Sequence, residues 1–135
     1  MTIETINPAS LYDGSNIGMS HAKVDKATGL VFISGQVDWN RDMAVKNSDI
    51  AAQTNGAIDH LITVLNEANS CVENILQLRI YVKGDVNQHM DALVPVVAKR
   101  LGIARPALTG VGVQSLASPD TLVEIEAVAK TRKLS

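Results

Sequence analysis

Two stretches near the C-terminus decide the fold: Arg105-Pro-Ala-Leu-Thr-Gly-Val-Gly-Val-Gln-Ser-Leu116 and Leu122-Val-Glu-Ile-Glu-Ala-Val-Ala129. Each is predicted to contain a β-strand. In the second stretch apolar residues alternate with glutamates, and because successive side chains of a strand point to opposite faces, Glu124 and Glu126 share the polar face. We therefore expect a half-buried strand with two carboxylates on one side, close to a turn that carries Arg105.

The two glutamates allow two interpretations. They could perform acid/base chemistry beside the arginine-bearing turn. They could also form the solvated side of a half-buried strand, as most exposed glutamate pairs do. The residues alone favour the solvated strand face.

The composition predicts one globular domain over residues 1–135. Hydrophobic residues make up 46% of the chain and charged residues 19%, which excludes a disordered chain. The formal net charge of -2 and the few aromatic residues provide neither a basic surface nor stacking platforms for bases, so nucleic acid is not expected as a partner. The sparse charge also indicates that subunit contacts cover part of the surface.

Neither a targeting sequence nor a transmembrane segment is predicted. The N-terminus lacks a basic start followed by an apolar core, and no apolar run approaches the length of a membrane span. We expect a cytoplasmic protein with no membrane partner.

No motif predicts a cofactor or a metal site. His21, His60 and His89 are far apart in the sequence, and no Cys/His/carboxylate spacing fits a metal site. His21 lies close to a predicted cleft strand, where a polar strand-edge residue is the favoured interpretation. The loop of residues 38–42 contains Trp39, and we expect an exposed indole there, at the rim of a cleft or in a subunit contact.

The N-terminal half is predicted to form a hairpin and a helix. Residues 18–25 and 30–39 are two extended runs joined by a short loop with a glycine, so this hairpin is expected to open the sheet. From residue 50 to residue 68 apolar residues recur at helical spacing, with Asp49 as the N-cap. Gly56 falls inside this helix, and we expect it to mark close packing against the sheet.

The C-terminal half is predicted to add three strands and a second helix. Residues 75–83 alternate as a half-buried strand, and an apolar helical stripe follows over residues 90–101. Pro95 interrupts that stripe, so the helix is expected to kink or to begin late. With strands at about residues 108–113 and 122–130, the order becomes ββαβαββ, an α+β fold in which a mixed sheet carries both helices on one face.

Several short motifs occur along this predicted fold. In chain order they are Ser34-Gly-Gln36 after an apolar strand, Gln53 in a helix opening, Arg79-Ile-Tyr-Val-Lys83, Arg105-Pro-Ala-Leu-Thr109 and Val123-Glu-Ile-Glu-Ala127. As an ordered set, from about residue 18 to residue 129, they resemble the Rid family, which is also called YjgF or L-PSP. The order and spacing carry this resemblance, since no single motif does.

The resemblance implies a chorismate-mutase-like fold assembled as a homotrimer with clefts between subunits. It also implies a reaction, because the best-understood members hydrolyse enamines and imines formed from amino acids. They release ammonia without a metal or a cofactor, so no cofactor is expected here.

Carried over residue by residue, the resemblance implies a modified site. Glu124 falls on the family's pocket glutamate, which helps to position the attacking water. Leu108 stands where deaminase members have an arginine that grips the substrate carboxylate, and Met19 stands where they have an aromatic hydroxyl. Arg105 is the candidate replacement for that arginine if a bend at Pro106 returns its side chain to the pocket. Otherwise we expect Arg105 to bind carbonyls or to lie in an interface.

We therefore expect a trimer that binds a small metabolite and hydrolyses an enamine, an imine or a related substrate in its intersubunit clefts. The catalytic residue would be Glu124, and the substrate-binding residues Arg105, Leu108 and Met19. Amino-acid enamines should be poor substrates, because a leucine cannot bind a carboxylate. Two alternatives remain: a non-catalytic ligand-binding or chaperone-like trimer, which the same leucine favours, and an endoribonuclease, which fits the acidic net charge poorly.

Overall fold

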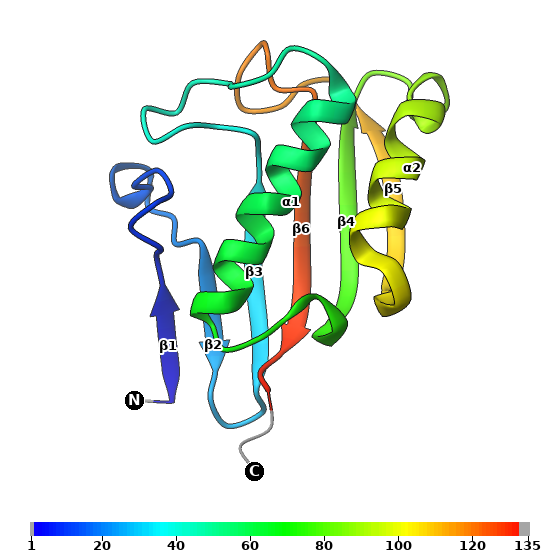
Figure 1. The fold of residues 1–135 in the computed structure, drawn as a ribbon. Helices are drawn as coiled ribbons and strands as arrows, with labels where there is room; N and C mark the ends of the chain where they lie inside the picture. The colour runs from blue at the N-terminus through cyan, green and yellow to red at the C-terminus, as the bar shows by residue number, and fades with distance from the viewer. Residues whose placement is uncertain (1, 133–135) are drawn as a thin grey trace.

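The computed structural model describes residues 2–132 and shows one mixed β-sheet with two helices on one of its faces (Figure 1). In chain order the elements are β1 (Ile3–Ile6), β2 (Ala22–Asp25), β3 (Leu30–Gln36), α1 (Ile50–Glu67), β4 (Ile75–Lys83), α2 (Met90–Leu101), β5 (Ala107–Val113) and β6 (Val123–Lys130). The strand order across the sheet is β1-β2-β3-β6-β4-β5, and only β4 and β5 run parallel as neighbours. None of the helices in the described part of the chain is long and apolar enough to cross a membrane.

The apolar face of β6 lies at the centre of the core. Its buried residues are at most 4% exposed: Val123, Ile125, Ala127 and Ala129. β6 lies between β3 and β4, and this face packs against α1. The predicted alternation is confirmed, and Glu124 and Glu126 lie on the face that carries no helix within residues 2–132 (Figure 1).

The first turns of α1 form as the sequence predicts, with one difference in packing. Asp49 is the N-cap, and its side chain accepts a hydrogen bond of 2.8 Å from the backbone N–H of Ala52. Gly56 lies inside the helix, where a Cβ would come within 1.9 Å of Oδ1 of Asp38. The glycine therefore makes room for a buried carboxylate in the loop after β3 rather than for the sheet.

α2 begins at Met90, so of the two effects predicted for Pro95, a kink or a late start, the late start is wrong. Pro95 lies in the second turn, where it cannot donate a hydrogen bond to the carbonyl of Asp91. Asp91 is exposed, so water can bind that carbonyl instead. The apolar stripe of α2 can then keep the helix continuous, because tertiary packing supplies most of the stability of a helix.

The sheet has one strand more than the sequence predicts. β1 pairs with β2, so the predicted hairpin does not open the sheet. Only Ile6 of β1 is buried, which leaves too little apolar pattern to recognise the strand. The strand predicted over residues 18–25 begins later, at Ala22, because Gly18 ends a short 3-10 turn with a φ of 74°.

A second, smaller apolar cluster overturns two predictions. Trp39 is only 9% exposed and packs with Tyr12 and Val37, so the predicted exposed indole is wrong. Its Nε1–H donates a 2.9 Å hydrogen bond to Oγ1 of Thr121, which compensates the indole for its burial. His21 is buried as well, rather than a strand-edge residue, and its Nε2 lies 2.8 Å from the carbonyl oxygen of Tyr12.

We expect Gly56→Ala to destabilise the protein, although alanine is the better helix former by about 1 kcal/mol. The added methyl group would overlap the buried Asp38 carboxylate, and overpacking of this kind costs about 1 to 3 kcal/mol. Subtracting the helix-propensity gain of about 1 kcal/mol leaves a net loss of up to about 2 kcal/mol in the free energy of unfolding, which urea denaturation measures.

The control is the same change in an Asp38→Ala background, where Gly56→Ala should be neutral or stabilising. Stabilisation by Gly56→Ala in the wild-type background would contradict the prediction, because it would show that Asp38 can move aside.

Candidate functional site

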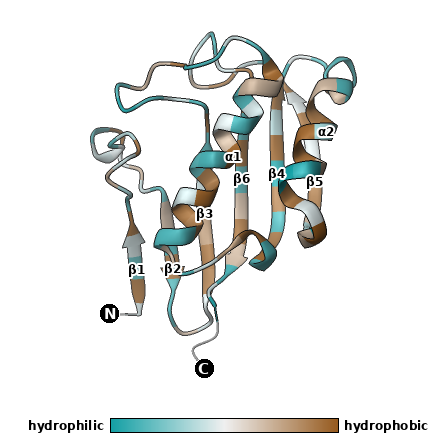
Figure 2. Ribbon diagram, in the orientation of Figure 1, coloured by the Kyte–Doolittle hydropathy of each residue, from teal (hydrophilic) through white to brown (hydrophobic). Residues whose placement is uncertain are grey.

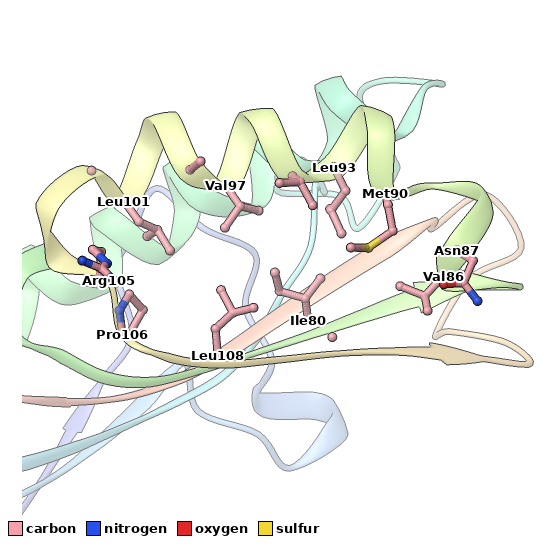
Figure 3. Close-up of a pocket in the computed structure, with 14 residues that line it drawn as sticks. Ile80, Val86, Asn87, Met90, Leu93, Val97, Leu101, Arg105, Pro106 and Leu108 are labelled. Atoms are coloured by element: carbon pink, nitrogen blue, oxygen red, sulfur yellow. The ribbon is translucent and has the colours of Figure 1, made fainter.

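An apolar pocket lies between α2 and β5, on the helix-covered face of the sheet (Figure 3). Its volume is about 680 Å³, and its walls come from α2 on one side and from β4 and β5 on the other. We call it the α2–β5 pocket. Its lining is apolar except for Asn87 at one end and Arg105 at the other (Figure 3).

Arg105 and Leu108 both line this pocket. Arg105 follows α2 with a φ of 41°, in the left-handed region that residues other than glycine seldom adopt, and Pro106 comes next. In one continuous strand, residues three apart would point to opposite faces. The bend at Arg105 lets both side chains line the same pocket. Arg105 is exposed, and within residues 2–132 its guanidinium forms no hydrogen bond or ion pair. Such a cation at the end of an apolar pocket can bind a carboxylate.

Glu124 lies on the opposite face of the sheet. In the antiparallel register it stands across from Tyr81 of β4. On its other side lies Gly35 of β3, where a Cβ would come within 2.5 Å of the carboxyl carbon of Glu124. Partial burial, and then the charge of Glu126, raise the pKa of Glu124. Within the described residues no group donates a hydrogen bond to this carboxylate, so it can orient a water molecule or bind a ligand amine.

Glu126 shares that face but has partners. The hydroxyl of Tyr81 donates a hydrogen bond to Oε1 of Glu126, and Nη1 of Arg79 lies 3.7 Å from the same oxygen. The hydrogen bond to Glu126 is the main cause of the raised pKa of Tyr81. The two glutamates that look equivalent in the sequence are therefore in different states: Glu126 is paired, and Glu124 has no partner among residues 2–132.

Met19 lies away from the α2–β5 pocket. Its thioether packs against Gly14 and against the cluster that contains Tyr12 and Trp39. No motif pointed to Tyr12, yet its pKa is raised by burial and by the charge of Glu124. An isolated tyrosine before the first predicted strand carries no sequence signal, so only the structure relates it to Glu124.

One chain divides the expected site residues between two faces of the sheet. Leu108 is in register with Leu78, which is buried in the core on the helix side. Glu124 is in register with Tyr81, on the face without helices. The sheet backbone thus separates Glu124 from the α2–β5 pocket of its own chain. The two parts could meet only where one copy contacts another.

The face without helices also has a hollow, of about 490 Å³, beside the paired carboxylate. Lys23, Ser34, Arg79 and Glu126 contribute polar groups to its walls, and Phe32 contributes an aromatic ring. Nowhere in the described part of the chain do three or more His, Cys, Asp or Glu side chains come together as a metal site would require.

The sequence model of the family described as Endoribonuclease L-PSP matches residues 17–131. The chain belongs to this family. It is 27% identical to the mitochondrial protein MMF1 of Saccharomyces cerevisiae over 129 residues, which cover 95% of this chain and 88% of that protein. The resemblance predicted from the motifs is therefore confirmed.

Solved structures of the family agree with the fold. A Mycobacterium tuberculosis member of the YjgF/YER057c/UK114 family has a TM-score of 0.81 at 29% identity, covering 96% of this chain and 99% of that one. A Yersinia pestis protein of the Rid family has a TM-score of 0.69 at 33% identity, covering 96% and 99%. The second is described as a protein of unknown function, so membership of the L-PSP family does not by itself assign a reaction.

The raised pKa of Glu124 predicts a pH-dependent stability difference between the wild type and Glu124→Gln. A carboxyl whose pKa rises on folding opposes folding once it is ionised, so it lowers stability above the ordinary pKa of 4.5. Glu124→Gln should therefore melt a few degrees higher than the wild type at pH 7, and the difference should disappear towards pH 4. Thermal unfolding followed across this pH range measures it.

Glu126→Gln is the matched control. This variant loses the ionic contact with Arg79 and weakens the bond from Tyr81, so its melting temperature at pH 7 should not rise. An equal rise in both variants would instead point to a general effect of removing one negative charge.

Proposed function

We propose that this chain forms a homotrimer whose intersubunit clefts bind a small metabolite and hydrolyse an enamine or an imine. Family membership supports the proposal, and so does the division of the site between two faces of one chain. A cleft that combines Glu124 with the α2–β5 pocket needs a second copy. β5 is also an exposed strand at the edge of the sheet, and proteins usually cover or protect such an edge.

The observation that carries the proposal is the state of Glu124. Its carboxylate is half-buried, it has no partner within residues 2–132, and it packs against Gly35, where any larger side chain would displace it. A purely structural strand glutamate would lie in solvent or pair with a cation, as Glu126 does with Arg79. A carboxylate with a raised pKa in such a position suits general acid/base catalysis, because it can both accept and return a proton.

In the proposed reaction Glu124 orients a water molecule against the carbon of a protonated imine. The water oxygen bonds to that carbon, and one water proton passes to the carboxylate, which gives a carbinolamine. Glu124 then returns the proton to the nitrogen, and the C–N bond breaks as the hydroxyl oxygen forms the carbonyl. The hydroxyl proton leaves with the ammonia as ammonium. An enamine enters this sequence after it takes up a proton at carbon, which gives the protonated imine directly.

Three further residues shape substrate binding in this proposal. Arg105 is the group that holds an anionic part of the substrate, since its guanidinium is free among the described residues. Leu108 supplies apolar surface beside it. Met19 packs against the cluster that contains Tyr12, and Tyr12 lies close enough to Glu124 to feel its charge. Met19 would therefore contribute to the cleft from the same copy as Glu124.

A second candidate function is a non-catalytic trimer that binds a ligand or acts as a chaperone, and Leu108 favours it because a leucine cannot grip a carboxylate. The family description names an endoribonuclease, but the net charge of -2 gives no attraction to a polyanion. The proposed location stays the cytoplasm, on the sequence grounds given above, although the relative MMF1 is named as mitochondrial.

Glu124→Gln tests the catalytic role. This change keeps the size of the side chain and removes its acid/base function, so the protein should fold while turnover of an imine substrate falls by about 100-fold or more. Ammonia release from imino acids formed in the assay by an amino-acid oxidase measures the turnover. Turnover in Glu126→Gln should fall much less. Equal losses of turnover in the two variants would argue for a general electrostatic effect.

The assembly is tested without any substrate. Light scattering coupled to size-exclusion chromatography at micromolar concentration should give three times the mass of one chain. A monomer at that concentration would contradict the proposed cleft, because Glu124 and the α2–β5 pocket would then remain on opposite faces.

A further inference from the structure

We infer that the α2–β5 pocket holds a large apolar side chain, branched aliphatic or aromatic, of a 2-imino acid whose carboxylate binds Arg105. The inference rests on the proposed function and names its substrate class. Water adds to the imine carbon, the C–N bond breaks, and the products are a 2-oxo acid and ammonium. The small imino acids derived from alanine or serine would then be poor substrates.

The mouth of the pocket exposes an unusual amount of apolar surface. Met90 is 44% exposed, Val94 46% and Leu108 50%, and all three line the pocket. Beneath them lie the buried Ile80 and Leu93 of the core. Figure 2 shows brown, hydrophobic segments along α2, and Figure 3 shows side chains of α2 and Leu108 of β5 pointing into the space between the two elements. Apolar side chains that remain exposed around a concave site indicate a ligand with an apolar body.

The size of the pocket argues for a large side chain rather than a small one. Its volume of about 680 Å³ lies within the usual range of small-molecule pockets. Between Met90 and Leu101, both of which line it, α2 rises by roughly 16 Å. A methyl side chain would leave most of this apolar surface in contact with water, whereas an isobutyl or benzyl group would displace that water.

Arg105 gives the ligand its polar end. The neighbouring cation Arg100 is occupied, because its guanidinium bonds to Oδ1 of Asp59 at 2.5 Å and to Oδ1 of Asn55 at 2.9 Å. Arg105 has no such partner within residues 2–132, and it lies beside Pro106 at one end of the apolar lining (Figure 3). The C-terminal end of α2 carries a partial charge of about −0.5 from the helix dipole, which repels an anion. The full positive charge of the Arg105 guanidinium outweighs this repulsion.

Leu108 determines where the charge of the ligand can lie. Its side chain lies on the strand wall of the pocket, between Arg105 and the middle of the apolar lining (Figure 3). An anion beside Leu108 would lose hydration without gaining a partner, so the carboxylate is confined to the Arg105 end. The remainder of the pocket is then left for the apolar side chain.

The first test measures binding of the stable products to the wild-type trimer by isothermal titration calorimetry. The probes are pyruvate, 2-oxobutanoate, 4-methyl-2-oxopentanoate and phenylpyruvate. We expect the last two to bind at least about tenfold more tightly than pyruvate, since each buried methylene group is worth roughly a fourfold change in affinity. Pyruvate binding as tightly as the larger acids would overturn the inference.

Two arginine substitutions test the role of Leu108. Leu108→Arg should weaken binding of 4-methyl-2-oxopentanoate by about tenfold and leave pyruvate binding equal or better, so that the preference disappears. Ile103→Arg is the matched control, because Ile103 is 91% exposed and does not line the pocket, so the same added charge should leave the preference intact. Loss of the preference in both variants, or in neither, would overturn the assignment of Leu108.

Arg105 is tested by removing its charge. Arg105→Met should weaken the binding of all four acids by about tenfold. Arg105→Lys should restore part of the lost affinity, because lysine keeps the positive charge but cannot make the bidentate contact of a guanidinium. Unchanged affinity in Arg105→Met would overturn the carboxylate contact.

Ammonia release from the corresponding imino acids separates this inference from the proposed function. If leucine- and phenylalanine-derived imino acids are hydrolysed faster than the alanine-derived one, both stand. If the larger oxo acids bind preferentially but no imino acid is hydrolysed, the assignment of the pocket stands and the proposed reaction fails. If the alanine-derived imino acid is the best substrate, the reaction stands and the inference fails. Failure of all four acids to bind would also overturn it, since a segment of a second copy would then be the occupant of the pocket.

Discussion

The buried side chain of Gln53 holds the first turn of α1 to the loop that leads into β6. Its Nε2 donates hydrogen bonds of 2.9 and 2.8 Å to the carbonyls of Asn47 and Asp120, and its Oε1 accepts one of 2.8 Å from the N–H of Leu122. Both N–H donors and the oxygen of this amide therefore have partners, as a polar side chain that is 1% exposed requires. β6 begins at the next residue, so this contact fixes its register. A slip of one residue would turn Glu124 into the core.

The state of Glu124 also depends on an irregularity in the strand beside it. The pairing of β3 with β6 shifts register between Ile33 and Gln36, and Gly35 lies within that shift. A bulge of this kind bends the strand and leaves one residue out of the ladder. Here the glycine leaves space that a side chain would take from the Glu124 carboxyl group. The proposed chemistry of Glu124 therefore requires a glycine at position 35 as well as the glutamate.

The sequence predicts the elements that carry a strong periodic signal, and it fails where tertiary contacts decide. α1, β4 and β6 follow from their apolar spacing, whereas β1 forms mainly by pairing with β2, which no local pattern reveals. The sequence predicts an exposed Trp39 at a loop tip, but the residue is buried and donates a hydrogen bond to Thr121, which is distant in the chain. The local sequence does not predict contacts between residues so far apart in the chain.

The same distinction applies to the candidate site. Strand alternation predicts that Glu124 and Glu126 share a face, but their inequality comes from Tyr81 and Arg79 on the next strand. The convergence of Arg105 and Leu108 on one pocket could not be derived from spacing either, because it depends on the left-handed backbone of Arg105. The sequence spacing therefore predicts the sheet face on which a strand residue lies. Its hydrogen-bond and ion-pair partners, which decide whether its carboxylate is free to react, come from other strands and are not predicted.

The position of the sheet between Glu124 and the α2–β5 pocket has a consequence for how such a site can change. In the proposed trimer the reacting carboxylate comes from one copy and the binding pocket from another, so the two parts belong to different packing environments. A substitution at Leu108 alters the side chains of α2 and β5 around the ligand, but it leaves the Gly35 space and the Glu126 pairing on the other face untouched. Substrate class can therefore change at one wall of the cleft while the acid/base group at the other wall keeps its surroundings. This separation gives a physical reason why, in the proposed trimer, the residue at position 108 can set the ligand that binds without disturbing Glu124.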